Sequence, residues 1–317
     1  MKMKDIISQY ISYRKSLGEK FKTNANELNC FLRYIDEDSE IDELNIKTCT
    51  DFLYAPKGKV TANWFCKHTA LKGLFQWALA REYITAIPLP SEKPKRPQGM
   101  LPYIYSNEEL KDLFSTALVY QKNRSSTYPE CIRMILMLTY MLGLRLHETV
   151  SLRMKDICMD KSFVYINESK FYKSRMVPFN DTVKRLLSDF LEWRQQNRQS
   201  EDAETHLFLN RKTAPMNIDT VRGCFKQIRK KTGISREDES PYQVRIHDLR
   251  HTFSVNRLTC WYKEGKDVQK LLPVLSTFLG HKHLAHTSAY LTMTNNLLEE
   301  ANNRFETYAN NENHGRK

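Results

Sequence analysis

The chain has 317 residues, of which 41% are hydrophobic, and it carries a formal net charge of +12 at pH 7. A single core seldom grows beyond about 250–300 residues, so the length predicts two domains. The positive charge favours a polyanionic partner, either nucleic acid or an anionic membrane surface. No apolar run is long enough to cross a bilayer and no signal peptide is recognisable, so we expect a cytoplasmic or nucleoid-associated protein.

Disulfides and metal sites are not expected. The seven cysteines are odd in number, scattered, and never arranged as C-x-x-C, a spacing typical of zinc ligands. His281, His283 and His286 form a local cluster, but no Asp, Glu or Cys stands nearby to complete a ligand set. Neither a metal nor another cofactor is therefore predicted.

Residues 1–87 predict a domain of four helices. Apolar residues recur there at helical spacing in four groups. The groups are Ile6 to Leu17, Leu28 to Ile35, Phe52 with Leu53, and Trp64 to Ala78. Four lysines between the apolar positions are candidate phosphate contacts or ordinary solvated side chains. These lysines are Lys57, Lys59, Lys67 and Lys72.

Residues 88–101 predict a stiff, extended linker, because four prolines and three cations interrupt the apolar periodicity. The cations are Lys93, Lys95 and Arg96. Two interpretations carry equal weight. The three side chains either follow the phosphate backbone of a nucleic acid or belong to a solvated connector.

Residues 102–317 predict a second domain, whose first helix is indicated by the capping-box pattern of residues 106–109. An almost wholly apolar helix over 132–142 follows, and Gly143 stands where a left-handed residue would end it. Arg145 comes next, at the start of a short helix over 146–152, where backbone N–H groups favour an anion. Taken alone, Arg145 would instead form a structural ion pair with Glu148.

Residues 162–179 change to strand character and predict a β-hairpin. Apolar β-forming residues occupy both arms. The segment between the arms carries Lys170 and Lys173, and Arg175 begins the second arm. These cations are candidate DNA contacts.

His247 and Arg250 are three residues apart, so both lie on one face of a helix predicted from about Asp248 toward Trp261. Both side chains can therefore meet one phosphate. His251 projects in another direction and is expected to pack or to support its neighbours. Residues 261–266 are expected to form a loop.

A second buried helix over 271–279 ends at Gly280, and His281 follows it. Tyr290 stands nine positions after His281, in a short helix that Thr287 or Ser288 would cap. A further apolar stripe predicts a tail helix. The stripe consists of Leu298, Ala301, Phe305 and Tyr308.

Together these positions supply the groups needed to cut a phosphodiester without a metal. Two guanidiniums can hold the phosphate, histidines and a lysine can move protons, and a phenol can attack. The order and surroundings of the residues resemble the tyrosine recombinases, also called the phage integrase family. The matching segments are Gly143 to Glu148, the run from His247 to His251, and Leu279 to His281 with Tyr290.

The resemblance implies a mainly α fold with a small β-hairpin or sheet, in which a helical core-binding domain and a catalytic domain clamp DNA. The implied catalytic residues are Arg145, Lys170, His247, Arg250, His281 and Tyr290. Tyr290 would attack phosphorus with His247 as its proton acceptor, and Lys170 would protonate the departing 5′ oxygen. Lys173 is the rival lysine, because the glycines that usually flank the family's lysine are missing.

The implied activity is site-specific recombination of double-stranded DNA through a 3′-phosphotyrosyl intermediate, without metal or ATP, for a mobile element, phage or chromosome. Four protomers would act on paired recombination sites, and the tail helix would dock on its own domain or on a neighbour. Two alternatives remain. One is a type IB topoisomerase-like nicking and closing enzyme, and the other is a DNA-binding regulator on the same fold without catalysis.

Overall fold

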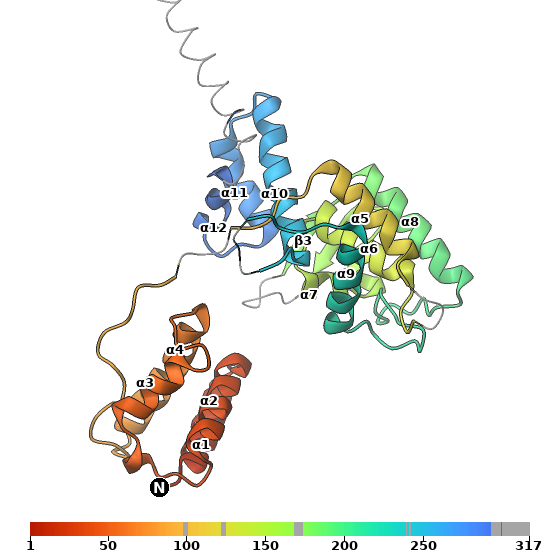
Figure 1. Ribbon diagram of the computed structural model, residues 1–317. Helices are drawn as coiled ribbons and strands as arrows, with labels where there is room; N and C mark the ends of the chain where they lie inside the picture. The colour runs from red at the N-terminus through yellow and green to blue at the C-terminus, as the bar shows by residue number, and fades with distance from the viewer. Residues whose placement is uncertain are drawn as a thin grey trace, which may run out of the picture. The chain divides into compact units, whose positions relative to one another are not determined.

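Residues 1–99 and residues 100–317 form two separate units in the computed structural model (Figure 1). The structure describes residues 1–97, 101–121, 125–167, 174–238, 240, 242–292 and 299. Each unit has a hydrophobic core of its own. The described residues are mainly helical and include one small antiparallel sheet, which confirms the fold class predicted from the sequence.

Four α-helices form the first unit over residues 1–97, in the places where the apolar periodicity predicts them. They are α1 (Met3–Ser16), α2 (Lys22–Ile35), α3 (Ile46–Tyr54) and α4 (Ala62–Leu79), and the 3₁₀ turn η1 (Ile41–Glu43) precedes α3. Asn45 and Thr61 begin α3 and α4, because each side chain accepts a hydrogen bond from a backbone N–H of the first turn. Phe31 and Phe75 are fully buried where α2 packs on α4.

Lys67 does not match the expectation of a phosphate contact. Its side chain is buried, and its Nζ donates hydrogen bonds to the carbonyl oxygens of Phe52 and Ala55, at 2.7 and 2.9 Å. Carbonyls at the end of a helix lack intrahelical partners and attract a cation. Lys67 therefore stabilises the end of α3. The other candidate lysines, Lys57, Lys59 and Lys72, are exposed.

The first part of the predicted linker packs onto the first unit. Leu89 is 8% exposed and belongs to the core of that unit. Lys93, Lys95 and Arg96 lie beyond it without regular secondary structure, and all three are exposed. The Arg96 guanidinium lies 4.8 Å from the centre of the Phe65 ring.

The second unit contains most of the chain's elements. Its helices are α5 (Asn107–Val119), α6 (Pro129–Met141), α7 (Leu146–Val150), α8 (Asp181–Gln196), α9 (Ile218–Thr232), α10 (Ile246–Lys263), α11 (Val268–Leu279) and α12 (Ala285–Ser288), with 3₁₀ turns η2 (Met154–Asp156) and η3 (Ala289–Thr292). The predicted capping box begins α5, where Ser106 and Glu109 exchange side-chain to backbone bonds. Figure 1 shows α10 and α11 side by side, and α10 also packs against α6.

The sheet has the order β1-β2-β3 among the described residues, with both neighbouring pairs antiparallel. β2 (Phe163–Ile166) and β3 (Arg175–Pro178) are the two arms of the predicted hairpin, and Ile166 pairs with Arg175. β1 (Ile157–Cys158) is an edge strand that the sequence pattern did not indicate. The connection between the arms, residues 168–173, lies outside the described residues, and with it Lys170 and Lys173.

Three further features of the second unit differ from the sequence-based expectation. Helices α8 and α9 were not anticipated. Residues 261–263 continue α10 instead of forming a loop, because Trp261 and Tyr262 pack against the apolar cluster of α10 and α11. Thr287 does not cap a helix, because it lies inside α12 and is fully buried.

No helix in the described part of the chain is both long enough and apolar enough to cross a membrane.

Candidate active site

Three arginines from different elements converge on the carboxyl end of α11. Each donates a hydrogen bond to a different one of three consecutive backbone carbonyls, those of residues 278–280. The bonds run from Arg175 Nε to Phe278 (2.9 Å), from Arg250 Nη2 to Leu279 (2.6 Å) and from Arg145 Nη2 to Gly280 (2.9 Å). The carboxyl end of a helix carries a partial negative charge and unpaired carbonyls. This end therefore holds three cations within one small region.

Glu148 joins two of these arginines. Its Oε1 accepts from Arg145 Nη1 at 2.8 Å, and its two oxygens accept from Arg175 Nη1 and Nη2 at 3.0 and 2.8 Å. Its Oε2 also accepts from the Arg145 backbone N–H, which completes a capping box at the start of α7. Burial raises the pKa of Glu148, but the hydrogen bonds and charges of Arg175 and Arg145 outweigh it and hold the pKa at about 2. Glu148 is therefore an anion that fixes both guanidiniums.

Two glycines let the backbone approach closely here. Gly143 has a φ of +57°, and its carbonyl accepts from Arg250 Nη1 at 2.6 Å. A Cβ on Gly143 would stand 2.6 Å from the Phe253 ring. Gly280 has a φ of +66°, and a Cβ there would stand 2.9 Å from Arg175 Nη1. The two glycines that were predicted to end helices therefore also leave room for neighbouring side chains, Gly143 for Phe253 and Gly280 for Arg175.

Tyr290 lies against one face of α10. It belongs to η3, its side chain is 2% exposed, and its hydroxyl lies 3.0 Å from His251 Nδ1. The His247 ring meets the His251 ring edge to face, with the ring centres 4.7 Å apart. The first turns of α10 therefore carry two imidazoles, with His251 in contact with the phenol.

His281 covers another side of the phenol. Its ring stacks on Tyr290 with 6.2 Å between ring centres, and its Nδ1 lies 2.8 Å from the Thr287 hydroxyl. The left-handed Gly280 ends α11 and lets the His281 backbone N–H bond to the carbonyl of Ser276. The same turn thus positions His281 and presents the three carbonyls to the arginines.

The ionisation of these groups follows from burial among cations. Burial, and then the charges of Arg250 and Arg145, lower the pKa of His281 to about 3. His247 keeps solvent contact, and its pKa is lowered by desolvation among the surrounding atoms and by Arg250. Burial raises the pKa of the Tyr290 phenol, although Arg250 and Ser254 act to lower it. Burial and then Arg145 lower the pKa of Arg250 to about 9, so it stays cationic at neutral pH.

The structure brings five of the six predicted catalytic residues into this cluster. They are Arg145, His247, Arg250, His281 and Tyr290. The sixth, Lys170, lies outside the described residues, as does Lys173. Arg175 was expected to face DNA, but its side chain is only 9% exposed and is held by Glu148. Lys93, Lys95 and Arg96 belong to the first unit and are exposed.

Two members of the cluster were not singled out from the sequence as site residues. The Glu148 carboxylate was weighed only as a structural partner of Arg145, and its bond to Arg175 joins residues 27 positions apart. His251 was expected to pack or to support its neighbours. Its position one turn after His247 was a usable signal, because residues four apart lie on one helix face.

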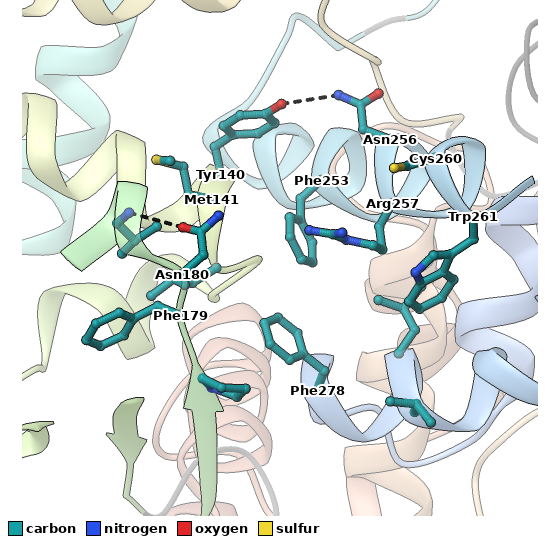
Figure 2. A pocket seen from close by; sticks show the side chains of 15 residues that line it. Tyr140, Met141, Phe179, Asn180, Phe253, Asn256, Arg257, Cys260, Trp261 and Phe278 are labelled. Atoms are coloured by element: carbon teal, nitrogen blue, oxygen red, sulfur yellow. Dashed lines mark hydrogen bonds between the residues drawn. The ribbon is translucent and has the colours of Figure 1, made fainter. Parts of the chain in front are cut away.

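An apolar pocket of about 580 Å³ lies beside this cluster in the second unit (Figure 2). Its wall includes Phe253 and Phe278, whose rings stack with centres 5.6 Å apart, together with Trp261 and the 57% exposed Val274. The Tyr140 hydroxyl and the Asn256 amide share a hydrogen bond of 3.2 Å at its edge. The pocket offers a binding surface for an apolar side-chain group.

Comparison with known proteins gives one family. The sequence profile of the phage integrase family matches residues 106–296. Among curated sequences, the candidate integrase/recombinase y4rB of Sinorhizobium fredii is 29% identical over 302 residues, which are 95% of this chain and 96% of that protein. The tyrosine recombinase XerD of Staphylococcus saprophyticus is 24% identical over 319 residues, covering 97% of this chain and 100% of that protein.

Solved structures share the fold. A lambda integrase dimer bound to a COC′ core site matches with a TM-score of 0.68 and 18% identity, over 92% of this chain and 78% of that chain. The XerH site-specific recombinase in a post-cleavage complex with a palindromic difH substrate matches with a TM-score of 0.64 and 22% identity, over 92% and 80% of the two chains.

Proposed function

This chain belongs to the phage integrase family, and on that premise we propose that it is a site-specific DNA recombinase that cuts and rejoins strands through a 3′-phosphotyrosyl intermediate. The observation that carries the proposal is the convergence of Arg145, Arg250 and His281 around the buried phenol of Tyr290. These groups supply charge stabilisation, a further hydrogen bond and a nucleophile in one place.

The two guanidiniums stabilise the nonbridging oxygens of the scissile phosphate. Arg145 and Arg250 are already fixed by bonds to Gly280 and Leu279, so they need little reorganisation when charge develops. An arginine has five N–H donors, which leaves donors for the phosphate. Removal of one fixed donor of this kind costs on the order of 3–4 kcal/mol in the transition state. His281 adds a further hydrogen bond to the same phosphate.

In the covalent step the phosphoryl group moves from the 5′ oxygen to the Tyr290 oxygen, and no water takes part. Tyr290 attacks phosphorus, the bond to the 5′ oxygen breaks, and a 3′-phosphotyrosine and a free 5′ hydroxyl result. The phosphodiester energy is kept in the covalent intermediate, so rejoining needs no ATP. Lys170 is the proposed donor of the leaving-group proton, and Lys173 is its alternative. Because the guanidiniums supply the charge stabilisation, no metal is required by this scheme.

The exposed candidate lysines of the first unit, Lys57, Lys59 and Lys72, and the cations of the linker are the proposed contacts to the phosphate backbone. Residues 1–87 would form a core-binding domain and residues 102–317 the catalytic domain, with the segment 88–101 between them. Lys93, Lys95 and Arg96 are exposed and free of salt bridges among the described residues. Each neutralised phosphate steepens the salt dependence of binding.

The proposed working assembly is a tetramer on two recombination sites. A lambda integrase of this fold has been solved as a tetramer bound to a Holliday junction.

The apolar pocket of Figure 2 suits the apolar stripe predicted in the tail, which lies outside the described residues. We propose that the tail of a neighbouring protomer docks in this pocket. Deletion of residues 297–317, or Val274→Asp, should abolish junction formation while binding to a single half-site persists.

The experiment that tests the function distinguishes a recombinase from a type IB topoisomerase and from a non-catalytic regulator. Supercoiled DNA with one site, and a pair of duplexes that each carry the site, are incubated with the protein in EDTA without ATP. A recombinase gives Holliday junctions and exchanged strands from the two duplexes. A type IB topoisomerase gives a ladder of topoisomers from the single plasmid at any sequence. Site binding with neither product would identify a non-catalytic regulator.

A further inference from the structure

We propose that His251, and not His247, accepts the proton of Tyr290 when the phenol attacks the DNA. This inference rests on the proposed function, because it assigns a residue to the cleavage step of that reaction. It identifies a catalytic residue that the sequence pattern did not separate from its neighbours.

Geometry favours His251. Its Nδ1 lies 3.0 Å from the Tyr290 hydroxyl, within the range of a direct proton transfer. Among the described residues no hydrogen bond joins His247 to Tyr290, and the ring of His247 instead contacts the His251 ring, with 4.7 Å between the imidazole centres. The acceptor role requires the tautomer with its proton on Nε2, which leaves the Nδ1 lone pair directed at the hydroxyl.

The surroundings keep His251 neutral in the free protein. It is half-buried on α10, and burial lowers its pKa to about 3, with further lowering by His247, Arg245, Arg250 and His281. His247 and Arg250 lie on the same helix, Arg245 immediately precedes it, and His281 follows α11. At physiological pH His251 is therefore neutral and its lone pair is free, which is the form that a proton acceptor needs.

The same surroundings couple the transfer to DNA binding. A phosphodiester held by Arg145 and Arg250 brings a negative charge beside these cations. That charge offsets the repulsion that an imidazolium at His251 would meet, so His251 becomes a stronger base when the substrate is present. In the free protein the transfer is unfavourable, since the phenol's own pKa is raised by burial. The nucleophile is therefore activated only with a phosphate in place.

The proton balance is complete over cleavage and rejoining. As the Tyr290 oxygen bonds to phosphorus, its proton moves to His251 Nδ1 and the 5′ oxygen leaves with a proton from the leaving-group acid. In rejoining, the 5′ hydroxyl attacks the phosphotyrosine and returns its proton to that acid. The departing phenolate then recovers its proton from His251. No oxidant, reductant or additional reactant is needed.

The test uses two substrates that differ only at the leaving group. One is a nicked duplex with an ordinary scissile phosphodiester, and the other has sulfur in place of the bridging 5′ oxygen, so its leaving group needs no proton. Covalent adduct formation by the full-length chain is timed for the wild type, His251→Gln, Lys170→Ala and the exposed control His283→Gln. Glutamine keeps a hydrogen-bonding group near the phenol but is not a base.

We expect His251→Gln to be slower by roughly 10²-fold or more on both substrates, because the phenolic proton must leave in either case. Lys170→Ala should be slow on the oxygen substrate and recover on the sulfur substrate, and His283→Gln should match the wild type. A second variant, His251→Ala, should recover activity when imidazole is added, because imidazole can enter the vacated space and take the proton.

Three outcomes overturn the inference. His251→Gln could cleave at about the wild-type rate, or it could recover on the sulfur substrate, which would place His251 at the leaving group. His251→Ala without imidazole rescue, together with a loss of thermal stability in both variants, would make His251 a packing residue. Absence of any adduct from the wild type is a different result, because it contradicts the proposed function itself.

Discussion

Arg175 donates two hydrogen bonds to Glu148, one to each carboxylate oxygen, at 3.0 and 2.8 Å. The pair connects β3 to α7. Glu148 Oε1 also accepts a hydrogen bond from Arg145 Nη1, so the carboxylate links Arg175 to Arg145. Arg175 was expected to contact DNA because of its charge, but it instead helps to hold Arg145 in place through Glu148. This arrangement depends on the negative charge of Glu148, and its contribution to stability can be measured.

Glu148→Gln should lower the free energy of unfolding at pH 7 by roughly 3 kcal/mol, the lower end of the range for breaking a buried ion pair. The lower end applies because the Arg145 side chain is 25% exposed and is partly compensated by water. Urea unfolding of the wild type and the variant measures the difference. Equal stability of the two proteins would show that Glu148 is not needed to hold the guanidiniums.

The same difference should depend on pH. The pKa of Glu148 in the folded protein is about 2, below its ordinary value. A lowered pKa means that the stabilisation is complete above the ordinary value of about 4.3 and is lost as the pH falls toward 2. The gap between the wild type and Glu148→Gln should therefore narrow between about pH 5 and pH 2. A gap that stayed constant over this range would contradict the assignment of the charge.

Arg175 and Lys95 should behave oppositely in DNA binding. Arg175→Gln should leave the dependence of DNA affinity on salt unchanged and lower the cleavage rate at saturating DNA, because its buried guanidinium positions Arg145 through Glu148. Lys95→Gln should reduce the salt slope by about 1 with cleavage at saturation unchanged. Fluorescence anisotropy across a salt series measures both slopes. A reduced slope for Arg175→Gln would return Arg175 to the phosphate contacts.

Lys67 should matter for folding and not for DNA. Lys67→Met leaves the buried carbonyl of Phe52 and the part-buried carbonyl of Ala55 without this donor, so we expect a loss of roughly 1–3 kcal/mol in the stability of the first unit. Lys72→Met, at an exposed position on the same helix, should change stability by less than about 0.5 kcal/mol. Thermal unfolding measures both, and an unaffected Lys67→Met would restore Lys67 as a candidate phosphate contact.

Gly280→Ala should impair both folding and cleavage. A left-handed residue with a Cβ costs on the order of 1–2 kcal/mol, and the added carbon would stand 2.9 Å from Arg175 Nη1. The guanidinium would shift away from Glu148 and the Phe278 carbonyl. Gly265→Ala is the matched control, because Gly265 is also left-handed but an added Cβ there meets no atom within 4 Å. Equal cleavage rates for the two variants would remove the positioning role of this contact.

Local sequence signals predicted much of the second unit. The capping box at Ser106 and the glycines at 143 and 280 mark helix ends that depend only on neighbouring residues, and all three are found in the structure. The spacing of His247 and Arg250 likewise follows from helical geometry. The convergence of Arg145 and Arg250 at the end of α11 was inferred from a family pattern, since no local rule brings together residues separated by 134 or 29 positions.

The features that could not be predicted from the sequence are contacts between residues that lie far apart in the chain. The bonds of Arg175 to Glu148 and of His251 to Tyr290 join residues 27 and 39 positions apart, so charge and helical spacing alone could not identify either partner. Lys67 was expected to be a phosphate contact or a solvated side chain because lysines are seldom buried, but its partners are the carbonyls of Phe52 and Ala55 at the end of α3. The choice between Lys170 and Lys173 stays a prediction, as both lie outside the described residues.

The most direct test of the central claim is to locate the covalent bond. The protein is trapped on a nicked target duplex in EDTA, the adduct is digested with protease and nuclease, and the modified peptide is sequenced by tandem mass spectrometry. We expect a 3′-phosphonucleotide on Tyr290, and no adduct from Tyr290→Phe. A nucleotide on any other residue, or an adduct formed by Tyr290→Phe, would contradict the account of this cluster as the site of strand cleavage.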